Sequence, residues 1–216
     1  MNIEHRTLVR ELRAAEPKTD GSIGVLAGYA AVFNSRSENL GGFFEEIAPG
    51  AFDGVLENDV RALIDHDSGR VLGRSSAGTL RMSVDATGLK YEVDLPDTQE
   101  ARDLLTLIKR GDVRESSFGF TVAHRGDDWA ENEDGQIIRT IHKVQRLYDV
   151  SPVAFPAYPA ATVAMRSLLQ RARDASPPTT PADDATQALI AAMEQRLAAA
   201  ETRLANHALM LRALRA

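Results

Sequence analysis

The sequence predicts one strand-rich folded unit over residues 1–171, followed by a linker at 172–185 and a helical tail at 186–216. Short apolar or alternating stretches recur through the first unit, and Gly- or Pro-containing turn signals separate them. After residue 171 the composition changes to Ser, Pro, Thr and Asp, which indicates a semi-extended linker. The 216-residue chain is 44% hydrophobic and 26% charged, which is typical of a globular protein.

Composition excludes several classes of protein and of site. With 31 acidic and 25 basic residues the net charge is -6, so we expect no specific nucleic-acid partner. The chain has no cysteine, which rules out disulfides, cysteine nucleophiles and thiolate metal sites. Residues 1–11 lack the uninterrupted apolar region of a signal peptide, and no stretch is long enough to span a bilayer. We therefore expect no membrane partner and a soluble intracellular protein.

The expected strands are β-branched, apolar or alternating in pattern. They cover residues 3–9, 23–33, 60–64, 79–84, 89–95, 117–123 and 137–150. The turn at 85–88 ends in Gly88, which can take a positive φ, so it joins two of these strands into a hairpin. The polar stretch at 125–135 predicts an exposed hairpin tip.

One helix has clear start and stop signals. Asp97 or Thr98 can cap it, a stripe of Leu and Ile follows at helical spacing, and Gly111 ends it. Shorter helices are expected at 51–56 and 163–170.

The tail carries apolar residues at alternating steps of three and four. They are Ile190, Met193, Leu197, Ala200, Leu204, Leu211 and Leu214, and the polar His207 occupies the seam position between Leu204 and Leu211. This seam is long enough for a weak coiled coil that self-associates or binds a partner. The alternative is an amphipathic helix that packs back on the first unit.

The histidines show no metal-binding pattern. They stand at His5, His66, His124, His142 and His207, and none forms an HxH or HxxxH pair. The sequence also lacks the glycine-rich loops that bind phosphates. We therefore predict neither a metal site nor a cofactor.

Two residues have a setting that suits nucleophilic catalysis. His66 ends an apolar strand between two aspartates, where a general base could be held rigidly. Ser117 precedes Phe118-Gly119-Phe120, where backbone N–H groups could stabilise an oxyanion. Each also has a plain structural interpretation: a turn histidine, and a strand start in front of two core phenylalanines. The serine motif is not the GxSxG of hydrolases.

Several motifs occur in a fixed order along residues 5–168. They are Gly-Tyr-Ala-Ala-Val-Phe-Asn at 28–34, Ile-Ala-Pro-Gly-Ala-Phe at 47–52, His-Asp at 66–67, Val-Leu-Gly-Arg at 71–74, Arg-Gly-Asp-Val at 110–113, Ser-Phe-Gly-Phe at 117–120, Leu-Tyr-Asp-Val-Ser-Pro-Val at 147–153 and Phe-Pro-Ala-Tyr-Pro at 155–159. Together they resemble the phage prohead (capsid maturation) serine protease family, which is similar to herpesvirus assemblin-type proteases.

The resemblance implies an α+β fold class. The expected fold has a mostly antiparallel, β-barrel-like core with a few surrounding helices, as in assemblin.

The resemblance also implies site residues. Ser117 matches the family's nucleophile, with Ser116 as the alternative one residue away, and His66 matches the base. The Asp149 position matches the third member of the triad. Assemblin-type enzymes use a second histidine there, so His142 and His124 are the alternatives for the third member. Besides backbone N–H groups, Arg139 or Arg146 could serve as an oxyanion donor.

The implied function is a prohead maturation protease. This serine endopeptidase would cleave the scaffold part of the major capsid protein and also itself, with residues 176–185 as a candidate self-cleavage site. It would act in the bacterial host cytoplasm, inside the immature prohead. The alternative is a non-catalytic internal scaffold protein that uses the same fold, with the tail as its working part.

Overall fold

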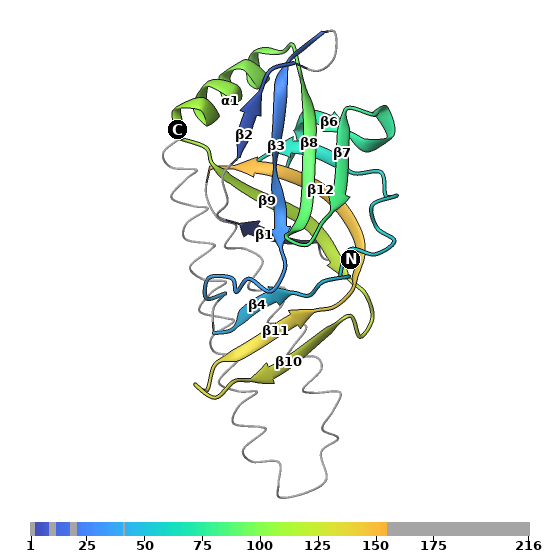
Figure 1. Ribbon diagram of the computed structural model, residues 1–216, viewed down its shortest axis with the longest axis vertical. Helices are drawn as coiled ribbons and strands as arrows, with labels where there is room; N and C mark the ends of the chain where they lie inside the picture. Colours follow the sequence, from blue (N-terminus) through green and yellow to red (C-terminus); the bar gives the residue numbers. More distant parts are fainter. Residues whose placement is uncertain (1–2, 9–11, 18–20, 41, 155–216) are drawn as a thin grey trace, which may run out of the picture. The chain divides into compact units, whose positions relative to one another are not determined.

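Three β-sheets build the described part of the chain, residues 3–8, 12–17, 21–40 and 42–154, in the computed structural model (Figure 1). The five-stranded sheet has the order β1 (Glu4–Leu8), β9 (Glu115–Val122), β12 (Val144–Val153), β5 (Arg61–Ile64) and β6 (Asp67–Arg74). The four-stranded sheet has the order β2 (Arg13–Ala15), β3 (Ser22–Val32), β8 (Gly88–Pro96) and β7 (Leu80–Val84). The three-stranded sheet has the order β10 (Asp127–Glu131), β11 (Ile137–Ile141) and β4 (Phe44–Ile47).

Most strand pairs are antiparallel, as predicted. The exceptions among the paired strands are β12 with β5 and β11 with β4, which run parallel. The strands of the four-stranded sheet cross those of the five-stranded sheet, with β3 lying over β9 (Figure 1). The fold is therefore three packed sheets around one core.

The core lies between the crossing sheets. Its fully buried side chains include Leu26 on β3, Leu89 and Tyr91 on β8, and Phe118 and Phe120 on β9. Burial of this apolar surface is the main favourable contribution to folding. Successive side chains of a strand point to opposite faces of its sheet. Since Phe118 and Phe120 face the core, Ser117 and Gly119 lie on the other face of β9.

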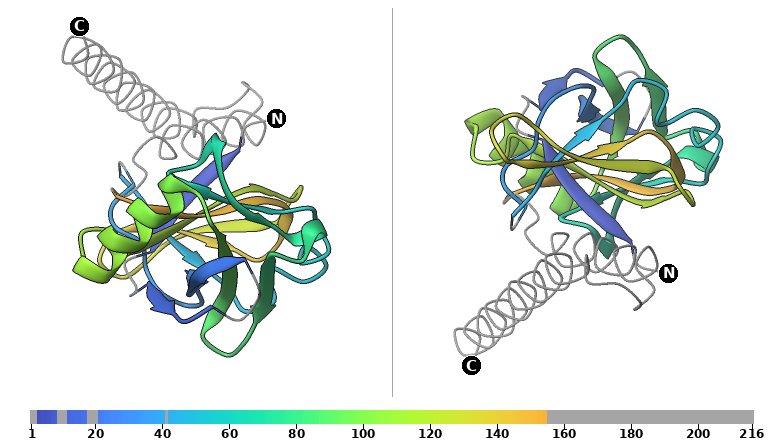
Figure 2. Two further views of the ribbon diagram at one scale, coloured as in Figure 1. Left: turned by 90° about the horizontal axis from the view of Figure 1, so that it is seen from above. Right: turned by 90° about the horizontal axis from the view of Figure 1, so that it is seen from below.

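The predicted helix is confirmed as α1 (Gln99–Arg110). The side chain of Thr98 accepts a hydrogen bond from the backbone N–H of Ala101, which satisfies one free donor of the first turn. Gly111 ends the helix with φ of 84°. The helix lies beside β2 on the outside of the fold (Figure 2). A short 3-10 helix, η1 (Ser75–Ala77), follows β6.

Of the few helices expected around the core, the described residues contain one α-helix. The helix expected at 51–56 is a run of turns. Backbone N–H groups there donate to the carbonyl three residues back, as Val55 does to Phe52. Gly54 has φ of 79°, a left-handed conformation that interrupts helical propagation.

The single strand expected at 137–150 is two strands, β11 and β12. The N–H groups of His142 and Lys143 both donate to the carbonyl of Gly126, so the chain leaves one sheet here and enters another. The stretch at 125–135 is likewise more than a hairpin tip, because it contains β10. Its Asp127 is buried against Arg139, and paired charges of this kind are invisible to a hydrophobic pattern.

The linker, the helical tail and the helix at 163–170 lie outside the described residues. Their boundaries at 171 and 185 therefore stay predictions. Within the described part, no helix combines the length and the apolar character needed to cross a bilayer.

Candidate active site

Three neighbouring strands of the five-stranded sheet present polar residues on one face. In the register of β1, β9 and β12, His5 stands opposite Gly119, and Gly119 stands opposite Asp149. Two residues along, the next row consists of Thr7, Ser117 and Ser151. Directly opposed residues of antiparallel strands share a face. The strand register therefore brings Ser117 and Asp149 together from positions 32 apart in the sequence.

His66 reaches this face from the hairpin between β5 and β6. Ile64 pairs with Asp67, so Asp65 and His66 form a two-residue loop, and both have positive φ, 51° and 59°. This is the pattern of a type I′ turn, which matches the twist of the flanking strands. Asp and His are among the non-glycine residues that adopt this conformation most readily.

The hairpin is also attached to the end of β12. The N–H of Asp65 donates to the carbonyl of Pro152 at 3.1 Å, and Oδ1 of Asp65 accepts from the N–H of Ala154 at 3.0 Å. The same strand carries Asp149. His66 and the Asp149 carboxylate are thus held by one connected unit, which preserves their mutual geometry.

Hydrogen bonds connect the three side chains in a line. Nε2 of His66 lies 2.6 Å from Oγ of Ser117, and Nδ1 lies 2.5 Å from Oδ1 of Asp149. An ionised carboxylate only accepts, so Nδ1 carries the proton and Nε2 is free to accept from the Ser117 hydroxyl. This is the arrangement that activates serine as a nucleophile in serine hydrolases.

The site is shielded but not sealed. Ser117 is fully buried and Asp149 is 5% exposed, while the side chain of His66 keeps 12% exposure. Oδ1 of Asp149 also accepts from Oγ of Ser151 at 2.6 Å. The carboxylate therefore has two donors on one oxygen, and these fix its orientation toward His66.

Comparison with known proteins agrees with the serine-protease-like geometry of this site. Residues 10–174, most of the chain, match the caudovirus prohead serine protease family. The chain belongs to this family. The prohead protease of Enterobacteria phage HK97 is 31% identical over 146 residues, which cover 67% of this chain. That alignment spans 61% of the length of the HK97 protein.

A solved structure with partial likeness is the capsid assembly protease of bacteriophage T4. The match covers 70% of this chain and 96% of the T4 chain at 10% sequence identity. Its TM-score is 0.41, which is too low to establish a common fold.

In this member of the prohead protease family, the alternative serine, Ser116, lies on the opposite face of β9 from Ser117. Ser116 is buried, and its Oγ lies 2.8 Å from the hydroxyl of Tyr91 on β8. Burial raises the pKa of Tyr91, and the hydrogen bond to Ser116 opposes that rise. Ser116 thus links the two sheets, since it lies on the core side of β9.

The alternative third members lie away from His66. Nε2 of His142 is 3.0 Å from Oδ2 of Asp128, in the exposed connection after β11. His124 is exposed in the turn after β9. Neither residue is on the face that carries Ser117.

The two arginines considered as oxyanion donors have other partners. Arg139 is 1% exposed and binds the carboxylates of Glu4, Glu45 and Asp127. Glu4 lies on the face of β1 opposite to His5 and Thr7. Arg146 is exposed and stands over the ring of Tyr148, with 5.1 Å between Cζ and the centroid.

Metal-ligating atoms also meet at this site. His5, His66 and Asp149 each offer one atom, all within 4.8 Å of one another. Two ligands of a tetrahedral zinc ion at about 2.0 Å each are separated by roughly 3.3 Å. The 2.5 Å contact between His66 and Asp149 is shorter than this, so it is a hydrogen bond with no room for an ion between them.

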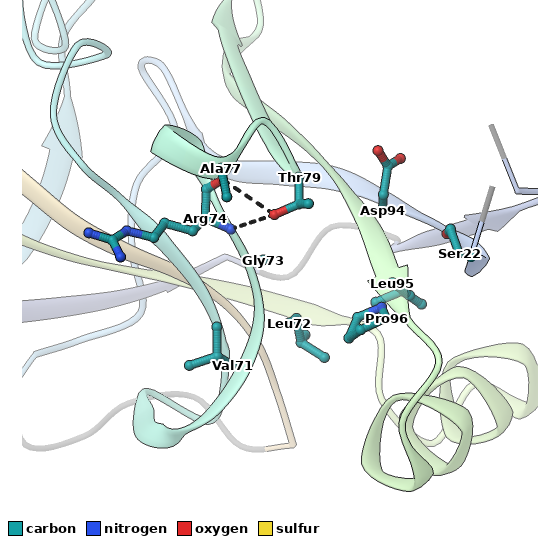
Figure 3. A pocket seen from close by; sticks show the side chains of 11 residues that line it. Ser22, Val71, Leu72, Gly73, Arg74, Ala77, Thr79, Asp94, Leu95 and Pro96 are labelled. Atoms are coloured by element: carbon teal, nitrogen blue, oxygen red, sulfur yellow. Dashed lines mark hydrogen bonds between the residues drawn. The ribbon is translucent and has the colours of Figure 1, made fainter. Parts of the chain in front are cut away.

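A separate hollow of about 450 Å³ lies between β6, η1 and β8 (Figure 3). Val71 and Leu72 of β6 face Leu95 and Pro96 across it, and Thr79 bonds the backbone of Arg74. None of the three aligned side chains lines this hollow. The hollow lies at the C-terminal end of β6, the strand that begins after His66.

Sequence reasoning missed two residues of the site, His5 and Ser151. His5 was one of several dispersed histidines, and its position opposite Gly119 depends on pairing between strands more than 100 residues apart. Ser151 lies two residues after Asp149, a spacing that places both on one face of a strand. This two-residue spacing is the sequence signal that could have indicated Ser151.

Proposed function

We propose that this chain is a serine endopeptidase that matures phage proheads, with Ser117 as nucleophile, His66 as base and Asp149 as the acid of the triad. The single observation that supports the assignment best is the hydrogen-bonded line from Asp149 through His66 to Ser117. Family membership adds independent support, because the matched family is defined by prohead serine proteases.

The reaction follows from this line of contacts. Oγ of Ser117 attacks the carbonyl carbon of a peptide bond while Nε2 of His66 takes the hydroxyl proton. Asp149 stabilises the imidazolium that forms, and backbone N–H groups near Ser117 are candidates to stabilise the oxyanion. The proton then passes to the departing amine as the C–N bond breaks. Water, deprotonated by His66, releases the acyl group and restores Ser117.

The substrate class comes from the resemblance. We propose that the protease cleaves the scaffold part of the major capsid protein and its own chain, within residues 176–185. It would act in the host cytoplasm inside the immature prohead. The tail at 186–216, as a coiled coil or an address for the shell, and an assemblin-like fold belong to the same proposal.

The direct test compares Ser117→Ala with the neighbouring Ser116→Ala. Each variant is purified and treated with a fluorophosphonate probe, and each is also co-expressed with the capsid protein of the same phage. Ser117→Ala should lose labelling and capsid cleavage by roughly 10⁶-fold, as in other serine proteases. Ser116→Ala should keep both and lose about 1–3 kcal/mol of stability, since the buried Tyr91 hydroxyl loses its hydrogen bond to Ser116.

The alternative, a non-catalytic scaffold protein, makes a different prediction in the same experiment. A scaffold needs no activated serine, so both variants would leave capsid assembly and processing unchanged. Labelling of the wild-type chain at a residue other than Ser117 would also contradict the proposed nucleophile.

A further inference from the structure

His5 lies next to the aligned side chains but outside the line of hydrogen bonds. Its ring stacks on the ring of His66, with centroids 3.9 Å apart and planes tilted by 31°. Its Nε2 stands 4.0 Å from Oδ2 of Asp149. That distance exceeds a hydrogen bond, so the contact is electrostatic. The two oxygens of Asp149 therefore have different neighbours: Oδ1 accepts from His66 and Ser151, and Oδ2 faces His5.

Gly119 makes this meeting possible. It stands between His5 and Asp149 in the cross-strand row of β1, β9 and β12. A Cβ atom at this position would overlap Oδ2 of Asp149 and lie 3.0 Å from Cδ2 and 3.1 Å from Nε2 of His5. The imidazole and the carboxylate thus fill the space above the glycine from its two sides. Glycine is required here because a larger side chain would collide with Asp149 and His5.

We propose that His5 is a positioning residue of the triad, which holds the ring of His66 against Ser117 and the carboxylate of Asp149 toward His66. The proposal rests on the protease function proposed above. With the hydrogen bonds at Nδ1 and Nε2 in place, the His66 ring could still tilt out of their plane. The His5 ring packs against its face and removes that freedom.

The charges around His5 suit a neutral ring. The charged and titratable groups that act on it are His66 from the hairpin, Asp149 from β12 and Arg6, its neighbour on the opposite face of β1, while Gly119 stands opposite it on β9. Burial lowers the pKa of His5, and His66 and Arg6 lower it further, against an opposing effect of Asp149. A neutral imidazole can stack on the imidazolium that forms during catalysis, whereas a charged one would repel it.

His5 also offers a clean test, because its side chain is 32% exposed and its removal opens no sealed core cavity. Three variants separate its features. His5→Phe keeps a stacked ring and removes Nε2, His5→Ala removes both, and His142→Phe is the matched control at a surface histidine. The measured quantity is the rate of Ser117 labelling by a fluorophosphonate probe between pH 4.5 and 8, with thermal unfolding of each variant alongside.

His5→Ala should label about 10- to 100-fold more slowly at pH 7, a fraction of the 10²- to 10⁴-fold that a positioned base supplies. His5→Phe should retain more of the rate than His5→Ala. The pKa of His5 is lowered, so His5 takes up its proton below pH 6.5, and the acid limb of the labelling rate should fall more steeply there in the wild type than in His5→Phe, which lacks this imidazole. His142→Phe should match the wild type in rate and slope.

Two results would overturn the proposal. One is a wild-type rate in both His5 variants, and the other is a slower rate with an unchanged acid limb and a proportionate loss of folded protein. Both differ from failure of the protease function itself, which would appear as no labelling of Ser117 in the wild-type chain.

Discussion

The two faces of β1 hold charged and polar groups in contrasting ways. On one face, His5 and Thr7 border the site, where hydrogen bonds connect Ser151 and Asp149 through His66 to Ser117. On the other face, Glu4 and Arg6 enter a buried network with residues of three further strands. Its other members are Glu45 on β4, Asp127 on β10 and Arg139 on β11.

The difference in connectivity separates two tasks. In the network each charge has several partners: Arg139 alone bonds three carboxylates, and Arg6 bonds Glu4 and Glu45. Such redundancy holds strands in register but leaves no group free to exchange a proton. In the site, His66 has one partner on each nitrogen, so a proton can move along the line. We therefore expect changes on one face to alter chemistry and changes on the other to alter stability.

Among variants that keep the Ser117 hydroxyl, the largest expected effect is loss of chemistry at Asp149. Asp149→Asn keeps the shape of the side chain but removes its negative charge, so it binds the His66 and Ser151 donors less strongly. It also favours the wrong tautomer of His66. Labelling of Ser117 should fall about 10⁴-fold, the effect of this change in other triads. The melting temperature should change little.

His142→Asn and His124→Asn are the matched variants for the rejected positions. They should label at the wild-type rate. A large loss in either one, with Asp149→Asn active, would assign the third member to a histidine instead.

The next effect is loss of stability on the opposite face. Arg139→Met leaves the carboxylates of Glu4, Glu45 and Asp127 buried with one guanidinium fewer. Removing one partner from buried ion pairs costs about 3–5 kcal/mol. For a chain of this size the melting temperature should fall by roughly 10 °C in calorimetry.

Arg146→Met is the control for this variant, because Arg146 lies exposed on β12 and surface changes stay within about 0.5 kcal/mol. At a temperature where both variants are folded, both should label at Ser117 normally. A stable Arg139→Met variant that labels slowly would show that the buried network affects the site, which would contradict the separate tasks of the two faces.

The smallest expected effect is a pH dependence of stability that differs between the two faces. Burial would raise the pKa of Glu4, but Arg139 and Arg6 more than offset it and lower the pKa below 4.5. The unfolded chain therefore takes up this proton first, so the stabilisation is complete above about pH 4.5 and is lost as the pH falls toward the folded pKa. For His5 the folded pKa lies below 6.5, so stability declines earlier, as the pH falls through 6.5.

Urea unfolding at a series of pH values separates the two groups. Glu4→Gln should flatten the dependence below pH 4.5, and His5→Phe should flatten it between pH 6.5 and the folded pKa. Glu4→Gln should also lose about 1–3 kcal/mol at pH 7, because an amide cannot satisfy both guanidinium groups. Identical curves for wild type and Glu4→Gln below pH 4.5 would contradict the lowered pKa.

Much of the fold follows from local pattern. The capped helix at 99–110 and most strands were predicted, because their capping residues, glycines and apolar periods act over a few positions. Errors arose where local signals conflict with distant partners. Asp127 made its segment resemble a surface tip, yet Arg139 pairs with it in the interior. The apolar run through 137–150 hid the change of sheet at His142.

The sequence by itself determined the family, the strand-rich class and the identity of Ser117, His66 and Asp149 as candidates, because ordered motifs survive in the linear chain. Only the tertiary structure decided that these three side chains touch, that Ser116 faces Tyr91, and that His5 stacks on His66. The reason is strand register: with a period of two, a slip of one residue would turn every one of these side chains to the other face.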